Sequence, residues 1–119
     1  MSGVDFRPIR TLKDRRLTAL VARGGIFFGL DLQGVQCQGA DLSGADFRGC
    51  DLRDADLRGA KLGPLTVGDG RFVRTDFTRA VLRGCDLRGA HAHRARFLEA
   101  DMNGANLAGC DLTDAELEV

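Results

Sequence analysis

The sequence predicts an all-β fold built from one repeated unit, and three observations support this prediction. A five-residue phrase repeats without a gap from Gly25 to Val119, giving 19 phrases in 95 residues. The middle residue of nearly every phrase is apolar, and the residue before it, usually Asp, points the opposite way because side chains alternate along an extended chain. Gly often closes the phrase, where a tight turn is needed. Such internal repetition determines the fold.

The middle position of the phrase and the position two residues before it are both expected to face inward. The middle residues are Phe27, Leu32, Cys37, Leu42, Phe47, Leu52, Leu57, Leu62, Val67, Phe72, Phe77, Leu82, Leu87, Ala92, Phe97, Met102, Leu107, Leu112 and Leu117. The earlier position is mostly Ala. A helix with 3.6 residues per turn cannot keep a five-residue stripe on one face, so the pattern indicates extended chain.

Two consecutive phrases, Ala40-Asp41-Leu42-Ser43-Gly44 and Ala45-Asp46-Phe47-Arg48-Gly49, carry a family resemblance. They resemble the repeats of pentapeptide repeat proteins, whose pattern is Ala-Asp/Asn-Leu-X-X, and the resemblance extends over residues 25–119. It implies a right-handed quadrilateral β-helix, a four-sided solenoid with four phrases per coil. Residues 60–74 depart from the pattern, because Asp is missing from the second position of each phrase and Pro64 removes a backbone donor. One side is expected to bulge there.

Residues 1–24 break the repeat and are expected to form a cap on the solenoid of residues 25–119. Thr11 is a candidate N-cap for a short helix that carries Leu12, Leu17, Leu20 and Val21, with Gly24 just past its end. The apolar side of this helix would cover the first coil. The alternative is a basic arm, because six basic and two acidic residues give the segment a formal charge of +4. One helix can serve both roles.

The last phrases are expected to leave the solenoid interior uncovered. The candidate end surface consists of Met102, Leu107, Leu112 and Leu117. Exposed apolar residues and unpaired backbone groups invite another chain. Either the chain is truncated at this point, or two copies meet there. Some pentapeptide repeat proteins form end-to-end dimers, so the resemblance favours a homodimer with a two-fold contact.

Stacking of phrases four apart predicts a basic patch on one side of the solenoid. The phrases that would share this side are 50–54, 70–74, 90–94 and 110–114, and the patch consists of Arg53, Arg71, Arg74, His91, His93 and Arg94. Acidic residues flank it, so one interpretation is a charge-balanced, solvated wall. The other is a site for a small anion or an acidic partner.

The composition indicates one soluble domain without a membrane span or a signal peptide, so we expect a cytoplasmic protein. All four cysteines fall at inward positions, namely Cys37, Cys50, Cys85 and Cys110. They are expected to be reduced and to fill the interior. No Cys-x-x-Cys pair is present, and both histidines fall at outward positions, so we expect no metal site.

No constellation of catalytic residues stands out, so the expected function is a non-enzymatic scaffold that binds an unidentified protein and needs no cofactor. The resemblance supplies an alternative. Some pentapeptide repeat proteins that confer fluoroquinolone resistance mimic DNA and bind DNA gyrase, a topoisomerase. That mimicry requires an acidic surface, whereas this chain has a formal net charge of zero. Nucleic-acid binding through a basic N-terminal arm is a third interpretation, although we expect no nucleic-acid partner.

Overall fold

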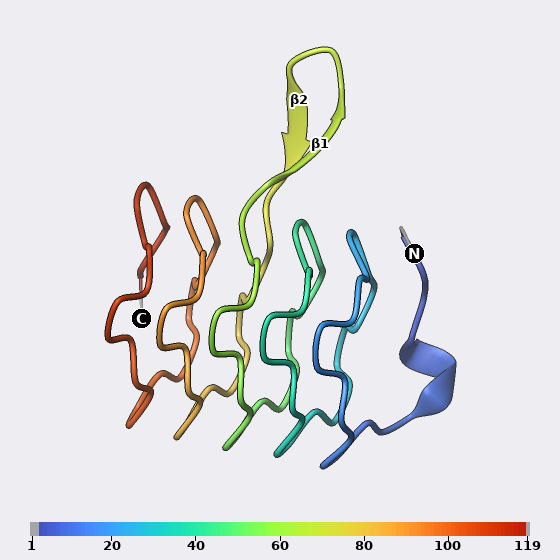
Figure 1. The fold of residues 1–119 in the computed structure, drawn as a ribbon, viewed down its shortest axis with the longest axis vertical. Helices are drawn as coiled ribbons and strands as arrows, with labels where there is room; N and C mark the ends of the chain where they lie inside the picture. The colour runs from blue at the N-terminus through green and yellow to red at the C-terminus, as the bar shows by residue number, and fades with distance from the viewer. Residues whose placement is uncertain (1–2, 119) are drawn as a thin grey trace.

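The computed structural model describes residues 3–118, and Met1, Ser2 and Val119 lie outside the described residues. The chain winds into a stack of similar turns, and a hairpin projects from one side of the stack (Figure 1). The named elements are the 3-10 turn η1 (Arg7–Ile9) and the strands β1 (Leu65–Gly68) and β2 (Arg71–Val73). Elsewhere in residues 3–118, extended chain pairs through isolated parallel bridges.

The bridges join each turn to the next in four columns, one on each side of the stack. Side 1 holds Asp5, Ile26, Asp46, Asp76, Arg96 and Glu116; side 2 holds Thr11, Asp31, Asp51, Val81 and Asp101; side 3 holds Arg16, Gln36, Asp56, Asp86 and Asn106; side 4 holds Val21, Asp41, Lys61, His91 and Asp111. This arrangement agrees with the predicted four-sided solenoid of five-residue phrases.

The corners are tight turns in which the last residue of the phrase has a positive φ. Around Ser43 and Gly44, for example, the Ala45 amide donates to the Leu42 carbonyl over 3.0 Å, and Gly44 has φ +68°. These are features of a type II turn, whose third residue favours glycine. Gly44 is also restricted by space, because a Cβ there would lie 2.6 Å from the Cβ of Leu65.

The interior is a set of stacked apolar columns, as predicted for most middle residues. Behind side 1 the rings of Phe6, Phe27, Phe47, Phe77 and Phe97 stack in order, with centroids 4.5 to 5.0 Å apart. This spacing matches the separation of about 4.8 Å between paired strands. The predicted positions of the cysteines are confirmed for Cys37, Cys50 and Cys85, which are buried, whereas Cys110 is half-buried; all four are free thiols.

The predicted N-terminal helical cap is wrong. Residues 11–24 form turns and bridges, in which Thr11, Arg16 and Val21 pair with the following turn of the solenoid. The only helical element among the described residues is the three-residue η1. The five-residue spacing explains the error, because Leu12, Leu17 and Ala22 continue the series of middle residues. The helix prediction gave more weight to capping signals than to this spacing.

The expectation that every phrase from residue 25 onward adds one side to the stack is also wrong. Bridge partners are twenty residues apart from the pair Thr11 and Asp31 up to the pair Asp41 and Lys61, but thirty apart for Asp46 and Asp76. Ten residues therefore leave the wall as the hairpin. Val67 and Phe72, which were predicted to face inward, are 51% and 39% exposed. The expected bulge between residues 60 and 74 lies at this position.

Candidate partner-binding site at the hairpin

The hairpin leaves the wall at a corner that Pro64 cannot form. The last residue of a phrase needs a positive φ to close its turn, and the proline ring holds φ near −65°. Lys61 still occupies its place in the column of side 4, where it pairs with His91, and the chain then departs at Gly63 and Pro64. It returns at Thr75.

Thr75 fastens the base of the hairpin to the wall. Its side chain is fully buried, with 0% exposure. The hydroxyl accepts a hydrogen bond from the Gly44 amide and donates one to the Gly63 carbonyl, both over 2.9 Å. Sequence analysis missed this role. The available signal was a Thr at the first position of its phrase, where Ala or Cys begins each later phrase.

The hairpin itself presents apolar side chains to solvent. In the antiparallel pair, Leu65 lies opposite Val73 and Thr66 lies opposite Phe72, with a bulge before Gly68 pairs with Arg71. Leu65 contacts the wall at Gly44. In contrast, Val67, Phe72 and Val73 are among the exposed large hydrophobic residues of the described chain. Packing in the interior therefore does not explain why these three positions are apolar.

Two arginines flank the exposed Phe72 ring. The guanidinium carbon of Arg94 lies 5.1 Å from the ring centroid, and that of Arg74 lies 5.7 Å from it. Arg74 also donates through Nη1 to the Arg94 carbonyl over 3.0 Å. Both distances fall within the range of cation–π attraction, which is worth about 0.5–1 kcal/mol at exposed sites. Phe72 is thus held in a defined orientation at the hairpin base.

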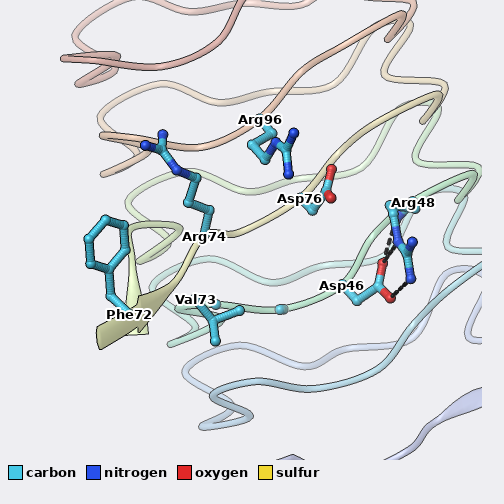
Figure 2. A pocket seen from close by; sticks show the side chains of 9 residues that line it. Asp46, Arg48, Phe72, Val73, Arg74, Asp76 and Arg96 are labelled. Atoms are coloured by element: carbon cyan, nitrogen blue, oxygen red, sulfur yellow. Dashed lines mark hydrogen bonds and ion pairs between the residues drawn. The ribbon is translucent and has the colours of Figure 1, made fainter. Parts of the chain in front are cut away.

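A groove lies between this cluster and side 1. It has a volume of about 490 Å³, and its lining side chains include those of Asp46, Arg48, Phe72, Val73, Arg74, Asp76 and Arg96. We call it the hairpin groove. Figure 2 shows the Phe72 ring at the opposite end of the groove from the Asp46–Arg48 pair, with Arg96 and Asp76 between them. The groove therefore combines an apolar end with a charged end.

Ion pairs organise the charged end of the groove. Arg48 donates to both carboxylate oxygens of Asp46, over 2.9 Å from Nε and 2.8 Å from Nη2. Partial burial disfavours the charged carboxylate, but these hydrogen bonds outweigh it and hold the pKa of Asp46 below its usual value. Glu116 is 3.0 Å from Arg96 and 3.9 Å from Arg74. The groove is thus polar without a large excess of either charge.

Histidines lie on the other side of the hairpin base. His91 follows Lys61 in the column of side 4, and His93 lies against Gly63, where an added Cβ would meet its ring at 2.4 Å. A hollow of about 280 Å³ is lined by these four residues together with Ser43 and Pro64. The Nδ1 atom of His93 is buried and has no hydrogen-bond partner among the described residues.

The structure brings together only part of the predicted basic patch. Arg74, His91, His93 and Arg94 lie around the hairpin base, and Arg71 begins β2. Arg53 lies apart on side 2, where its guanidinium is 2.8 Å from Asp51. The predicted stacking of phrase 70–74 on phrase 90–94 is wrong, because His91 pairs with Lys61 and Asp111. The ten-residue excursion shifts every later phrase relative to the predicted alignment.

Paired charges on the walls form a pattern that sequence analysis did not identify. Where Asp and Arg flank a middle residue, the arginine folds back and binds both carboxylate oxygens. The five pairs of this kind are Asp5–Arg7, Asp46–Arg48, Asp51–Arg53, Asp56–Arg58 and Asp86–Arg88. We call them the Asp–Arg wall pairs. They neutralise the walls locally, and the Asp-x-Arg spacing was the signal for them.

Two further observations limit the chemistry of the described residues. Residues 3–118 contain no group of three or more His, Cys, Asp or Glu side chains placed to hold a metal ion. Nor does this part of the chain contain a helix with the length and apolar character needed to cross a membrane.

The repeats of this chain match a known protein family. The profile for pentapeptide repeats matches residues 27–63 and 75–114, with eight copies. The two matched regions stop at either side of the hairpin. No curated protein matches the chain.

The solved structures that this chain matches include two pentapeptide repeat proteins, Rfr23 and HetL, and the fluoroquinolone resistance protein QnrB1. Rfr23 from the cyanobacterium Cyanothece 51142 has 19% identity and a TM-score of 0.73, over 85% of this chain and 63% of that protein. HetL from Nostoc sp. strain PCC 7120, involved in heterocyst differentiation regulation, has 26% identity and a TM-score of 0.44, over 90% and 59%. QnrB1, a plasmid-mediated fluoroquinolone resistance protein, has 14% identity and a TM-score of 0.42, over 97% and 73%.

Of these three alignments, the one with Rfr23 has a TM-score high enough to support the fold. Its sequence identity of 19% supports no statement about function. This chain spans less than two thirds of the length of Rfr23 and of HetL, at 63% and 59%.

Proposed function

The chain belongs to the pentapeptide repeat family, and on that premise we propose that it is a non-enzymatic scaffold that binds a partner protein through the hairpin and the hairpin groove. The stacked turns supply a rigid support, and the hairpin supplies the specific surface. Functional residues commonly lie on loops that a rigid scaffold holds in place.

The exposure of Val67, Phe72 and Val73 is the observation that carries this proposal. A ten-residue excursion that served only to connect two phrases would be expected to be polar, since its side chains bury little surface. Here three large apolar residues face solvent next to a groove with charges at its other end. Apolar contacts ringed by polar groups are typical of protein interfaces.

A pull-down with matched variants tests the proposal. Wild-type protein is compared with a variant that lacks residues 64–73 and with Arg53→Gln, which alters a wall pair far from the hairpin. We expect a partner that the wild type and Arg53→Gln capture equally and that the deletion variant loses. A photoreactive amino acid at position 72 should crosslink to the same partner. Equal capture by all three proteins would refute binding through the hairpin.

Binding to DNA gyrase remains the alternative function. A DNA mimic presents rows of uncompensated negative charge, whereas the Asp–Arg wall pairs neutralise four aspartates on sides 1 to 3 between residues 46 and 88. This favours the scaffold over the mimic. A gyrase supercoiling assay separates the two, because a scaffold of the proposed kind leaves supercoiling unchanged and a gyrase binder inhibits or protects the enzyme.

We further propose a cytoplasmic location and self-association through the C-terminal end. Buried free thiols suit a reducing compartment, in keeping with the four unpaired cysteines. At the end of the stack Leu117 is 46% exposed, and Met102, Leu107 and Leu112 are only partly buried. Apolar surface of this kind is suited to contact with a second copy.

A further inference from the structure

The two ends of the solenoid carry opposite charge. Residues 1–24 contain six basic and two acidic side chains, a formal charge of +4. Residues 97–119 contain six acidic and no basic side chains, a formal charge of −6. Figure 1 shows the described parts of these segments, residues 3–24 and 97–118, at opposite ends of the stack. The molecule is therefore polar along its axis, although its net charge is zero.

Many of these end charges make no ion pair with another described residue, unlike the charges of the Asp–Arg wall pairs. In the first turn Arg10, Lys13, Arg15, Arg16 and Asp14 make no ion pair with any described residue. In the last turn the same holds, within residues 3–118, for Asp111, Asp114 and Glu118. Between the two ends, in contrast, each aspartate of the Asp–Arg wall pairs forms an ion pair with its arginine. Among the described residues, the charges without an ion pair are therefore mostly positive in the first turn and all negative in the last.

The backbone groups exposed at the two ends are complementary as well. The amide of each middle residue donates to a carbonyl in the following turn of the stack. The acceptor belongs to the residue before the middle residue that lies above it, as when the Leu87 amide donates to the Asn106 carbonyl over 2.8 Å. In the last turn the corresponding amides have no acceptor among residues 3–118; they are those of Met102, Gly104, Leu107, Gly109, Leu112 and Asp114. The carbonyls of Ala100, Ala105 and Cys110 in that turn also lack a donor within residues 3–118, so its unmatched groups are mostly amides. In the first turn the unmatched groups of the described chain are mostly carbonyls, those of Thr11, Lys13, Arg16 and Thr18, together with the Arg16 amide.

We propose that copies of this chain associate head to tail, with the basic, carbonyl-rich first turn of one copy seated on the acidic, amide-rich last turn of another. A contact between two C-terminal ends, as the sequence alone suggested, would oppose two segments of formal charge −6 and two faces that both have an excess of donors. The head-to-tail contact pairs unlike charges and unlike backbone groups, and it extends the ladder of the solenoid.

The geometry of the stack also sets the orientation of the second copy. Asp5 and Glu116 lie in the same column, that of side 1. Among the described residues, the first and the last bridged phrases therefore lie on the same side. The second copy continues the winding when it is rotated by one side about the stack axis. Because each copy then keeps one free end, the contact does not close, and the product is a linear series of oligomers.

Sedimentation velocity over a range of protein and salt concentrations is the primary test. We expect a series of species that grows with protein concentration and that weakens when the salt is raised from about 50 mM to about 500 mM, since screening removes the attraction between the ends. A single dimer that strengthens with salt would overturn the proposal in favour of paired C-terminal ends. A protein that stays monomeric at millimolar concentration would overturn it altogether.

Variants that neutralise end charges should change the strength of association in opposite directions in the two arrangements. Asp111→Asn/Asp114→Asn keeps the polar turn contacts and the tolerance of Asn for positive φ, but removes two negative charges. In the head-to-tail contact this change raises the concentration for half-association by roughly three- to tenfold. Between like ends it would strengthen association. Arg15→Gln/Arg16→Gln should weaken the head-to-tail contact similarly, and its failure to do so would count against the proposal.

Carbodiimide crosslinking identifies the contact directly. The chain has two lysines, Lys13 in the first turn and Lys61 in the middle of the stack. The rotation by one side sets Lys13 over side 3, next to Asp111 and Asp114 of side 4. Linkage of Lys13 to Asp111 or Asp114 in an oligomer band joins opposite ends and is the expected product. Oligomer bands without a Lys13 link to the last turn would contradict it, and the Arg53→Gln protein serves as a control with both ends intact.

Discussion

The rings of Phe47 and Phe77 stack with centroids 5.0 Å apart although thirty residues separate them in the chain. Phe27 and Phe47, only twenty residues apart, stack at 4.9 Å. The interior therefore continues unchanged across the hairpin. An excursion of ten residues, two phrase lengths, preserves both the five-residue register and the column of aromatic rings.

The first prediction is that the hairpin can be removed without loss of the fold. Deleting residues 64–73 joins Gly63 to Arg74, which takes the last position of the phrase. Arg79 and Arg94 occupy that position with φ +62° and +61°, so an arginine is tolerated there. The variant should unfold at the same temperature as the wild type or slightly higher, because a shorter connection costs less chain entropy to close. Loss of the β-type circular dichroism spectrum would show that the hairpin supports the stack.

The second prediction concerns the aromatic column. Phe77→Ala should lower the free energy of unfolding by about 3–5 kcal/mol, because it leaves a cavity between Phe47 and Phe97. The control is Phe72→Ala, which removes an exposed ring and should cost about 0.5 kcal/mol or less. Chemical denaturation of both variants measures the difference. Equal costs would mean that the Phe77 ring does not support its neighbours.

The sequence was sufficient to predict the solenoid but not the path of the chain through it. A five-residue period reports only position within the phrase, so an insertion of two whole phrases leaves it unaltered. The aromatic residues held the missing information, since Phe27, Phe47, Phe77 and Phe97 are spaced by twenty, thirty and twenty residues. Equal stacking distances require that the thirty-residue step contain an excursion. Pro64 marks its beginning.

The first turn was missed for a different reason. Residues 10–24 keep apolar middle residues at Leu12 and Leu17, but they lack the Ala and Asp of the later phrases. The first position of a phrase is buried in later turns, as at Ala40, and there it requires a small residue. Arg15 occupies that position in the first turn, where it is exposed at the end of the stack, so a long charged side chain is tolerated. Composition at an end thus differs from composition in the middle, as is general for solenoids. The groove could not be predicted, because it depends on where the hairpin folds back.

The third prediction is that the cysteines react in an order set by burial. Burial raises the pKa of both Cys37 and Cys50 to about 12, and it raises the pKa of Cys85 and Cys110 as well. A thiol with a raised pKa supplies little thiolate near neutral pH, and burial also blocks reagents. Only the half-buried Cys110 should be labelled in the folded protein. Mass spectrometry after mild alkylation would contradict this if Cys50 or Cys85 were modified equally fast.

The fourth prediction is a loss of stability in acid. Hydrogen bonds from Arg7 lower the pKa of Asp5 from 3.8 to about 2, and those from Arg53 lower the pKa of Asp51. A carboxylate with a depressed pKa in the folded state stabilises the fold above its unfolded pKa and ceases to do so as the pH falls through its folded pKa. The melting temperature should therefore decline between about pH 4 and about pH 2.

A variant without wall arginines checks the cause of this decline. In Arg53→Gln/Arg58→Gln/Arg88→Gln the partner aspartates should titrate nearer their ordinary pKa, so the melting temperature of the variant should fall less over the same interval. Melting curves at several pH values compare the two proteins. An identical decline in both would show that the Asp–Arg wall pairs are not its source.

The fifth prediction uses two positions that the five-residue period cannot tell apart. Leu87 and Val67 both stand at the middle of a phrase, but Leu87 is 0% exposed and Val67 is 51% exposed. Leu87→Asp places an unpaired charge among stacked apolar side chains and should cost more than about 4 kcal/mol, enough to unfold the protein. Val67→Asp places the same charge in solvent on the hairpin and should change the stability by about 0.5 kcal/mol or less. Circular dichroism and urea titration distinguish the two outcomes. If both variants unfolded, Val67 would belong to the interior and the chain would wind without the excursion; if neither did, the column that contains Leu87 would not be part of the core.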